Sequence, residues 1–146
     1  MRKFEKVSRV SEIDFELPKR STKNSAGYDF INPEQVTIQA GELLYVKTGI
    51  KAAMYENEVL ILANRSSNPM KKGLVLINGI GVIDADYYNN PDNEGEIAFA
   101  FMNTTLSPVT IEAGEKLGQG IFIEYFTTED DAAEGDRLGG FGSTGA

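Results

Sequence analysis

The sequence predicts an all-β barrel or sandwich, because short apolar runs alternate with turn residues along most of the chain. Turn signals recur about every ten residues, a spacing typical of such folds. No segment sustains helical periodicity. The 146 residues suffice for one ordinary domain, and 41% hydrophobic with 25% charged residues is typical of a soluble globular protein. We therefore expect a single domain with one buried core.

The strands are expected where apolar residues alternate with polar ones, or run continuously for the length of a strand. They are residues 36–39, 43–46, 58–62, 73–77, 80–83, 95–102, 109–111 and 121–126. In the run 95–102, the period of two places Ile97, Phe99 and Phe101 on one face. The dipeptide Asn78-Gly79, between the fourth and fifth runs, predicts a hairpin with an Asn-Gly turn.

One short helix is expected within residues 65–73. A Ser or Asn can cap it, Pro69 suits its first position and Gly73 suits its end. Free backbone N–H groups at its start would face Arg65 and Ser66 and form a small anion site. An ordinary capped turn without a ligand explains the same residues.

The composition restricts the possible chemistry. The chain contains no His and no Cys, which excludes the usual zinc sites and the Ser-His and Cys-His nucleophiles. An enzyme with this composition would use a carboxylate as its base. The absence of Cys favours a cytoplasmic location, and we find neither a signal peptide nor a membrane-spanning apolar run. The net charge of −8 argues against nucleic acid as a partner.

Positive charge is concentrated at the start of the chain. Seven of the 14 Lys and Arg residues lie within the first 23 positions, and Arg65 and Arg137 are the only arginines after them. Both lie among Gly, Ser or Asn residues, whose donors can close around an anion. A shared anionic ligand is therefore expected, although a single solvated arginine is the commoner case.

Two stretches carry carboxylates or glycines in patterns that suggest a site. Asp84 and Asp86 follow an apolar run, and we expect Asp84 to be partly buried and to act as a base. Paired carboxylates could also hold a metal, and a solvated turn is an equal alternative. The C-terminal GDRLGGFGSTGA has the composition of a disordered tail, but Arg137 and Phe141 favour binding.

Five stretches in this order, AGYDF, RSSNP, GVIDADY, GEKLGQGIF and GGFGSTG, resemble the five motifs of the trimeric dUTPases. The resemblance implies a jelly-roll β-barrel over residues 1–134 and a flexible Gly-rich lid over residues 135–146. It implies a homotrimer with three shared active sites that hydrolyses dUTP to dUMP and pyrophosphate with Mg²⁺. Such an enzyme keeps uracil out of DNA and supplies dUMP for dTTP synthesis.

The same resemblance assigns the site residues. Asp84 would activate the water that attacks the α-phosphorus, and Asp29 would lie near a metal-bound water. Tyr87 would pack beneath the deoxyribose and exclude a 2′-hydroxyl. The remaining assignments bind uracil (Asn78, Gly81, Ile83), the phosphates (Arg65, Ser66, Ser67, Gln119, Arg137) and, in the lid, the base and phosphates (Phe141, Gly142, Ser143, Thr144). Mg²⁺ would be held by the phosphates and water, with no direct protein ligand.

The sequence departs from the family pattern at three places. Arg137 lies one position closer to the Gly-Gly-Phe than is common. Lys116 and Gly118 stand where Arg and Ala are usual, and the segment after Tyr87 is longer than the family's short turn. Two alternative functions remain at this point: a dCTP deaminase of the same fold, and a non-catalytic module that senses nucleotides.

Overall fold

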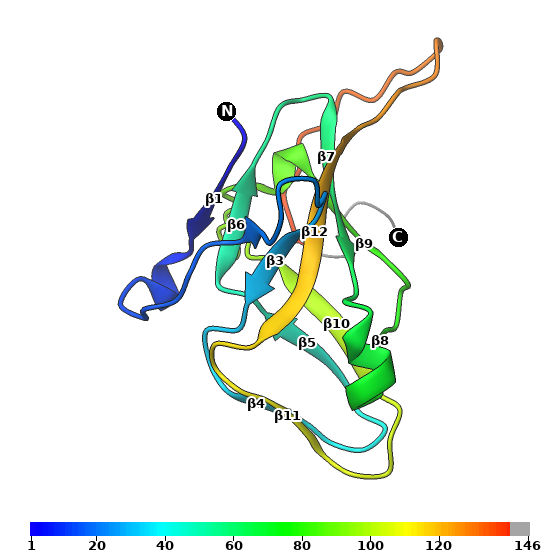
Figure 1. Cartoon of the computed structure of the whole chain (residues 1–146). Helices are drawn as coiled ribbons and strands as arrows, with labels where there is room; N and C mark the ends of the chain where they lie inside the picture. Colours follow the sequence, from blue (N-terminus) through cyan, green and yellow to red (C-terminus); the bar gives the residue numbers. More distant parts are fainter. Residues whose placement is uncertain (141–146) are drawn as a thin grey trace.

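Strands dominate the structure, a computed structural model that describes residues 1–140 (Figure 1). In chain order they are β1 (Lys3–Lys6), β2 (Lys19–Arg20), β3 (Tyr28–Ile31), β4 (Val36–Ile38), β5 (Leu43–Lys47), β6 (Ile50–Ala53), β7 (Glu58–Ala63), β8 (Leu74–Leu76), β9 (Gly81–Asp84), β10 (Ala98–Asn103), β11 (Val109–Ile111) and β12 (Lys116–Glu124). Single helical turns span Ser8–Val10, Asn68–Lys72 and Ala85–Tyr87. The all-β prediction is confirmed.

The strands of the described residues form four antiparallel sheets rather than one closed barrel. The largest has the order β2-β3-β12-β7-β9, and a second has the order β5-β10-β8. Two-stranded ribbons, β1-β6 and β11-β4, complete the set. The core lies where the inner faces of these sheets meet.

Alternation along the strands determines which side chains enter that core. Leu60 and Leu62 of β7 and Ile83 of β9 are buried on the inner face of the five-stranded sheet. Phe99 and Phe101 of β10 are buried opposite them. Other members of the core include Phe30, Ile97, Ile111 and Leu117. The predicted common face of Ile97, Phe99 and Phe101 is therefore confirmed as a core face.

The outer face of the five-stranded sheet carries polar side chains at its two ends and apolar ones between. Gln119 of β12 lies opposite Asp29 of β3, and Asp84 of β9 lies opposite Val59 of β7. Directly opposite residues share one face of a sheet. Between these ends, Val82 is 53% exposed and Ile123 is 46% exposed. The sheet thus presents an apolar strip to solvent in the single chain.

The predicted Asn-Gly hairpin is wrong as a strand pairing. The turn exists, with Gly79 at φ +77° and its N–H donating to the carbonyl of Leu76. However, β8 pairs with β10, whereas β9 pairs with β7. The two strands therefore leave the turn into different sheets, because each finds a partner distant in sequence.

Several strand boundaries differ from the prediction. β10 starts at Ala98 instead of residue 95, and β12 starts at Lys116 instead of residue 121. The prediction missed four strands, namely β1, β2, β3 and β6. β1, with the sequence KFEK, forms because it pairs along β6, which its own residues do not reveal.

The predicted short helix is confirmed in place but not in its cap. Residues Asn68–Lys72 form one turn with Pro69 near its start and Gly73, in the left-handed conformation at φ 66°, at its end. Ser67 precedes it without a capping side-chain hydrogen bond. Within residues 1–140, no helix has the length and apolar character needed to cross a membrane.

Candidate active site

Four residues that the sequence analysis singled out lie close together at the end of β9. This base cluster consists of Asp84, Asp86, Tyr87 and Arg137. The Arg137 guanidinium forms ion pairs with the carboxylates of both aspartates, at 2.9 Å from Nε to Asp86 Oδ1. β9 ends at Asp84 and the helical turn Ala85–Tyr87 follows, which directs both carboxylates toward one cation.

The base cluster opens onto a cavity of about 430 Å³. Its lining includes Asp84, Asp86, Tyr125 and Arg137. The predicted partial burial of Asp84 is wrong for the single chain, where its side chain is 51% exposed. Asp84 points to the outer face of the sheet, where Arg137 of the same chain covers part of its side chain. An exposed carboxylate beside a cavity can accept a proton from a bound water.

Tyr87 is buried and fixed by hydrogen bonds. Its hydroxyl donates to the carbonyl of Glu96 at 2.8 Å and accepts from the Asn93 amide at 2.8 Å. Burial raises the pKa of the Tyr87 phenol above its ordinary value. The guanidinium carbon of Arg137 lies 5.6 Å from the centre of its ring. The ring is therefore a rigid, neutral surface beneath the base cluster.

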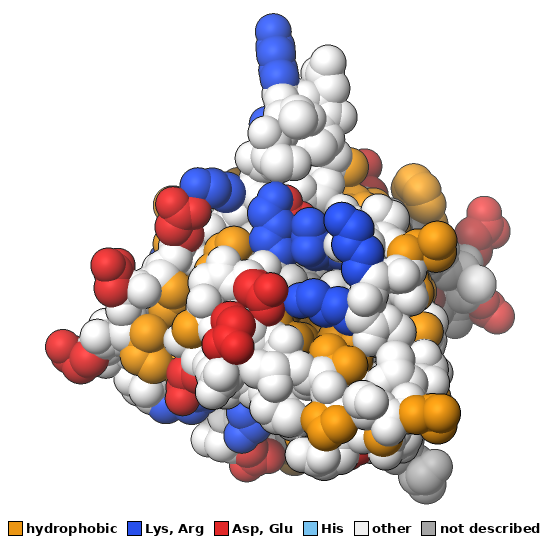
Figure 2. Space-filling view, turned by 60° about the horizontal axis from the view of Figure 1, so that its bottom comes forward, with side chains coloured by type: hydrophobic (Ala, Val, Ile, Leu, Met, Phe, Trp, Pro, Cys, Tyr) orange, Lys and Arg blue, Asp and Glu red, His pale blue; other side chains and the backbone are white. Residues whose placement is uncertain are grey.

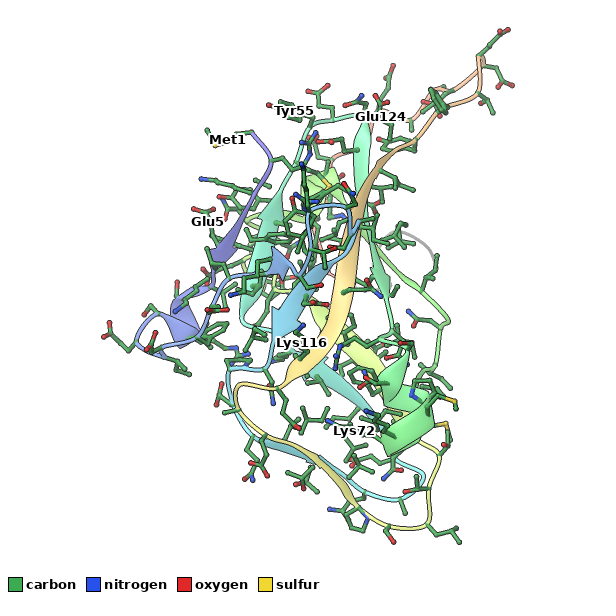
Figure 3. All side chains as sticks on the ribbon, viewed as in Figure 1. Met1, Glu5, Tyr55, Lys72, Lys116 and Glu124 are labelled. Atoms are coloured by element: carbon green, nitrogen blue, oxygen red, sulfur yellow. The ribbon has the colours of Figure 1, made fainter. Side chains whose placement is uncertain are left out.

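A second group of predicted residues lies at the other end of the outer face. This anion cluster consists of Asp29, Arg65, Lys116 and Gln119. Lys116 Nζ is 3.0 Å from Asp29 Oδ2, and the Gln119 amide donates to the carbonyl of Asn64 at 3.1 Å. Lys116 and Lys72 lie in the lower half of the molecule in Figure 3. Viewed from that end, the surface shows Lys and Arg side chains gathered together (Figure 2).

Arg65 stands out within this cluster. In the part of the chain that the structure describes, no hydrogen bond or ion pair engages its guanidinium. Ser66 is exposed and Ser67 half-buried in the turn that follows. An unpaired cation beside hydroxyl donors in a chain of net charge −8 is suited to an anionic ligand.

Gly27 explains how Gln119 enters the anion cluster. A Cβ at Gly27 would lie 2.0 Å from Gln119 Oε1. The glycine of AGYDF thus leaves room for the Gln119 side chain to cross from β12 toward Asn64. This contact ties the first and fourth of the sequence motifs together in space.

The residues predicted to read uracil lie near the turn between β8 and β9. Asn78 is exposed, whereas Gly81 and Ile83 are buried along β9. Asn78 and Gly81 line a narrow cavity with Tyr45, Leu62 and Ala98. A wider cavity of about 310 Å³ adjoins it through Tyr45 and Ala98, and Asn93 lies in its wall.

The base cluster and the anion cluster do not meet within one chain. Asp84 lies opposite Val59, whereas Gln119 lies opposite Ala63, four residues further along β7. At about 3.3 Å per residue this is roughly 13 Å. Figure 3 shows the two ends of β12, with Lys116 in the lower half of the molecule and Glu124 near its top. The structure therefore brings the predicted residues together in two groups, which lie apart within one chain.

The C-terminal segment leaves the body after β12 and then returns to it. Residues 125–136 are exposed, and the chain comes back beside β9 (Figure 1). Besides the Arg137 contacts, the carbonyl of Gly139 accepts a hydrogen bond from the Asn90 amide at 2.7 Å. The predicted lid residues Phe141, Gly142, Ser143 and Thr144 lie outside the described residues.

The carboxylates near the two clusters suit Mg²⁺ only with help from a ligand. Within residues 1–140, no group of three or more acidic side chains could hold a metal ion. Asp29 is a largely buried carboxylate beside the anion cluster, with a side chain 15% exposed. One carboxylate, together with phosphates and water, is a donor set that Mg²⁺ commonly accepts.

Sequence reasoning missed three polar residues of the site. Asn64 accepts hydrogen bonds from the Arg65 N–H and the Asn68 amide, and so it fixes the turn of the anion cluster. Asn90 and Asn93 contact Gly139 and Tyr87 from the loop after Tyr87. Nothing in their local sequence distinguishes them from asparagines of an ordinary surface turn.

Comparisons with known proteins match this chain to dUTPases over almost its whole length. The model of the dUTPase family matches residues 14–145. A curated deoxyuridine 5′-triphosphate nucleotidohydrolase of Lactococcus lactis subsp. lactis is 49% identical, and the match covers 100% of this chain and 99% of the relative. The dUTPase structure from Streptococcus mutans is 49% identical with a TM-score of 0.81, over 86% of this chain and 98% of that one. A dUTPase structure of Staphylococcus bacteriophage 80alpha with dUpNHpp, 22% identical over 100% of this chain and 99% of that one, shares the fold with a TM-score of 0.73.

Proposed function

The chain belongs to the dUTPase family, and we propose that Asp84 is the base with which it hydrolyses dUTP to dUMP and pyrophosphate. The observation that carries this role is the position of the Asp84 carboxylate, exposed at the end of β9 on a cavity of about 430 Å³. The chain has no His or Cys that could replace it. As a dUTP diphosphatase, it removes a precursor of uracil in DNA and supplies dUMP for dTTP synthesis.

In the proposed reaction, Asp84 accepts a proton from a water molecule as the water oxygen attacks the α-phosphorus. A new bond forms between that oxygen and phosphorus, and the bond from phosphorus to the α–β bridging oxygen breaks. Pyrophosphate leaves with the bridging oxygen, and dUMP retains the oxygen of the water. A positioned base of this kind typically contributes about 10²–10⁴ to the rate.

Arg65, Ser66, Ser67 and Gln119 bind the phosphates in this proposal. The unpaired Arg65 guanidinium and the ordered Gln119 amide support it. Arg137 neutralises Asp84 and Asp86 in this structure, so it must release Asp84 before that carboxylate can act as a base. The triphosphate offers Arg137 a more highly charged partner and would draw it to the γ-phosphate.

Asn78, Gly81 and Ile83 bind uracil, mainly through backbone groups, and Tyr87 packs beneath the deoxyribose. The narrow cavity at Asn78 and Gly81 and the fixed ring of Tyr87 support these roles. Cytosine would leave some of the polar groups of such a slot without hydrogen-bond partners. The slot would therefore discriminate strongly against cytosine. Phe141, Gly142, Ser143 and Thr144 then close over the base and phosphates as a lid.

In this proposal, the phosphates of the nucleotide and water would hold Mg²⁺, with no direct protein ligand. When bound, it offsets phosphate charge and stabilises the leaving pyrophosphate. Asp29, with its carboxylate beside Lys116 and Gln119, would orient a metal-bound water. The protein's part is to position that single carboxylate.

We further propose a homotrimer with shared active sites. Two features support it: the separation of roughly 13 Å between the base and anion clusters, and the apolar strip between them that includes Val82 and Ile123. Contact with another copy would cover the strip and bring the anion cluster of one chain to the Asp84 of its neighbour. A cytoplasmic location, where dUTP is formed, completes the proposal.

The test is pyrophosphate release from dUTP, UTP, dCTP and dTTP, with Asp84→Asn as the matched variant. We expect strong preference for dUTP, and an Asp84→Asn protein that binds dUTP but turns over at least about 100-fold more slowly. Near-normal turnover by Asp84→Asn would refute the role of the base. Ammonia released from dCTP would instead indicate a deaminase.

A further inference from the structure

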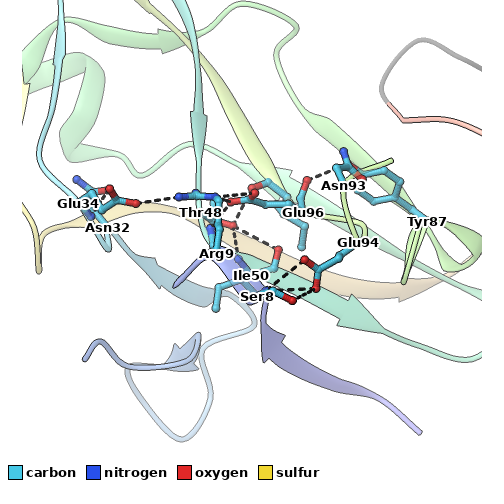
Figure 4. A network of polar contacts seen from close by, with 12 residues as sticks. Ser8, Arg9, Asn32, Glu34, Thr48, Ile50, Tyr87, Asn93, Glu94 and Glu96 are labelled. Carbon is cyan, nitrogen blue, oxygen red and sulfur yellow. Dashed lines mark hydrogen bonds and ion pairs between the residues drawn. The ribbon is translucent and has the colours of Figure 1, made fainter. Parts of the chain in front are cut away.

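The loop after Tyr87, residues 88–96, folds back onto the Tyr87 side chain. Its Asn93 amide donates to the Tyr87 hydroxyl, and that hydroxyl donates to the carbonyl of Glu96 (Figure 4). The phenol is thus restrained from two sides by one loop. Two such hydrogen bonds leave the ring little freedom to tilt or shift.

The backbone of the loop is shaped to hold Asn93 in this position. The Asn93 side-chain oxygen accepts from the Gly95 N–H at 3.0 Å while its amide nitrogen reaches Tyr87. Gly95 has φ +82°, and a Cβ there would lie 2.3 Å from the carbonyl oxygen of Tyr87. Asn89 and Glu94, neither of them glycine, also have positive φ values of 59° and 63°. Such backbone strain persists only where the surroundings enforce it.

Contacts with distant parts of the chain supply that enforcement. The Glu94 carboxylate accepts from the Ser8 hydroxyl at 2.9 Å, and Lys51 of β6 donates to the Asn89 side chain at 2.6 Å. The Glu96 side chain is 8% exposed and forms an ion pair with Arg9 (Figure 4). The loop is therefore held at three points by the body of the protein.

Asn93 also lines a cavity close to the residues proposed to bind uracil. This cavity has a volume of about 310 Å³ and adjoins the narrow cavity of Asn78 and Gly81. A nucleoside with its base at Asn78 would direct its sugar toward this wider space. The residue that fixes Tyr87 thus lies beside the expected place of the sugar.

We propose that Asn93 is a positioning residue for Tyr87 and thereby helps the enzyme select deoxyribose over ribose. The inference rests on the proposed function, in which Tyr87 excludes the 2′-hydroxyl. To exclude one hydroxyl group, the Tyr87 ring must be held rigidly. Functional groups of a site must stay within about 0.5 Å of their working geometry. The loop of residues 88–96 supplies that restraint in this chain through Asn93 and the carbonyl of Glu96.

The test compares kcat/KM for dUTP and UTP in wild type, Asn93→Ala, Tyr87→Phe and the double variant, with pyrophosphate release as the readout. Asp92→Ala, an exposed change in the same loop, is the matched control. We expect Asn93→Ala to reduce the dUTP/UTP ratio about 3- to 10-fold, the effect of losing one hydrogen bond. In the Tyr87→Phe background, where the acceptor is gone, the same change should have no further effect.

The outcomes separate the two proposals. If wild type does not prefer dUTP to UTP, the proposed function fails and the inference falls with it. If wild type discriminates and Asn93→Ala keeps the full ratio, only the inference is overturned. An equal loss in the Tyr87→Phe background also overturns it, because Asn93 would then act elsewhere. Because Asn93→Ala also removes the acceptor for the Gly95 N–H, thermal unfolding of this variant shows whether the fold is retained, and its kcat for dUTP shows whether the site is intact.

Discussion

Single residues in this protein are constrained by close approach as much as by chemistry. Gly118, where the resemblance to the family led us to expect Ala, is the clearest example. A Cβ at this position would lie 2.4 Å from Cε1 of the Phe99 ring. Phe99 cannot retreat easily, because it packs edge-on against Phe30 and stacks on Phe101. The Phe99 ring thus occupies the space that a methyl group at position 118 would need.

This pairing predicts that Gly118→Ala lowers the free energy of unfolding by about 1–3 kcal/mol, the usual result of overpacking a core. Replacing Phe99 by Leu in the same protein should recover part of the loss, because the smaller side chain gives the methyl room. Denaturant unfolding of both variants checks the prediction. Gly135→Ala, at a position with no neighbour within 4 Å, is the control. If Gly118→Ala is as stable as wild type, the Phe99 ring can move aside at no cost, and the prediction is wrong.

Among the elements, β1 depends most on contacts with residues distant in sequence, which its own residues do not predict. β1 pairs with β6, and Arg2, just before it, forms an ion pair with Glu58 at the start of β7. The Arg2 guanidinium also lies 5.4 Å from the centre of the Tyr55 ring. The hydrogen bond from Arg2 lowers the pKa of the Glu58 carboxyl below its ordinary value. The charged form of Glu58 is therefore favoured in the folded protein.

A lowered folded-state pKa contributes stability above the unfolded pKa of about 4.3, and this contribution is lost as the pH falls through the folded value. We expect Glu58→Gln to lower the melting temperature at pH 7, and the difference from wild type to shrink below about pH 4. Melting curves across this pH range check it. Lys19→Ala, which removes an ion pair with both side chains more than 60% exposed, should change little at either pH. A Glu58→Gln effect independent of pH would contradict the prediction.

At the scale of the whole molecule, the question is whether one chain can complete an active site. Asp84 and Arg65 lie in clusters at opposite ends of the outer face. If active sites are shared, chains carrying Asp84→Asn and chains carrying Arg65→Ala can complement each other in a mixed trimer. Each variant alone should be nearly inactive, because each lacks one part of every site.

Co-refolding the two variants at equal amounts should restore activity to about one quarter of the sites, since each intact residue then has an even chance of being supplied. Pyrophosphate release from dUTP measures the recovery, and sedimentation measures the assembly. A separately folded mixture without exchange serves as the control. No recovery in assembled trimers would place both residues in the same site of one chain.

Local sequence was informative where the alternation of apolar and polar residues determines which face of a strand is buried. The alternation through Ile97, Phe99 and Phe101 predicted a core strand, and burial of apolar area enforces that choice. The five ordered motifs predicted the family, and the small residues of RSSNP and Gly73 located the one-turn helix. The absence of His and Cys favoured, from composition alone, a carboxylate as the base of an enzyme.

The tertiary structure decided everything that depends on partners distant in sequence. β8 and β9 flank an Asn-Gly turn, yet each pairs with a strand from elsewhere. The same holds for the site. The exposure of Asp84 and its ion pair with Arg137 depend on residues distant in sequence, and the hydrogen bond from Asn93 to Tyr87 depends on the conformation of the loop. Short-range sequence patterns record which face of a segment is apolar. They do not record which strand or loop will satisfy its hydrogen bonds and charges, because that is settled only when the chain closes on itself.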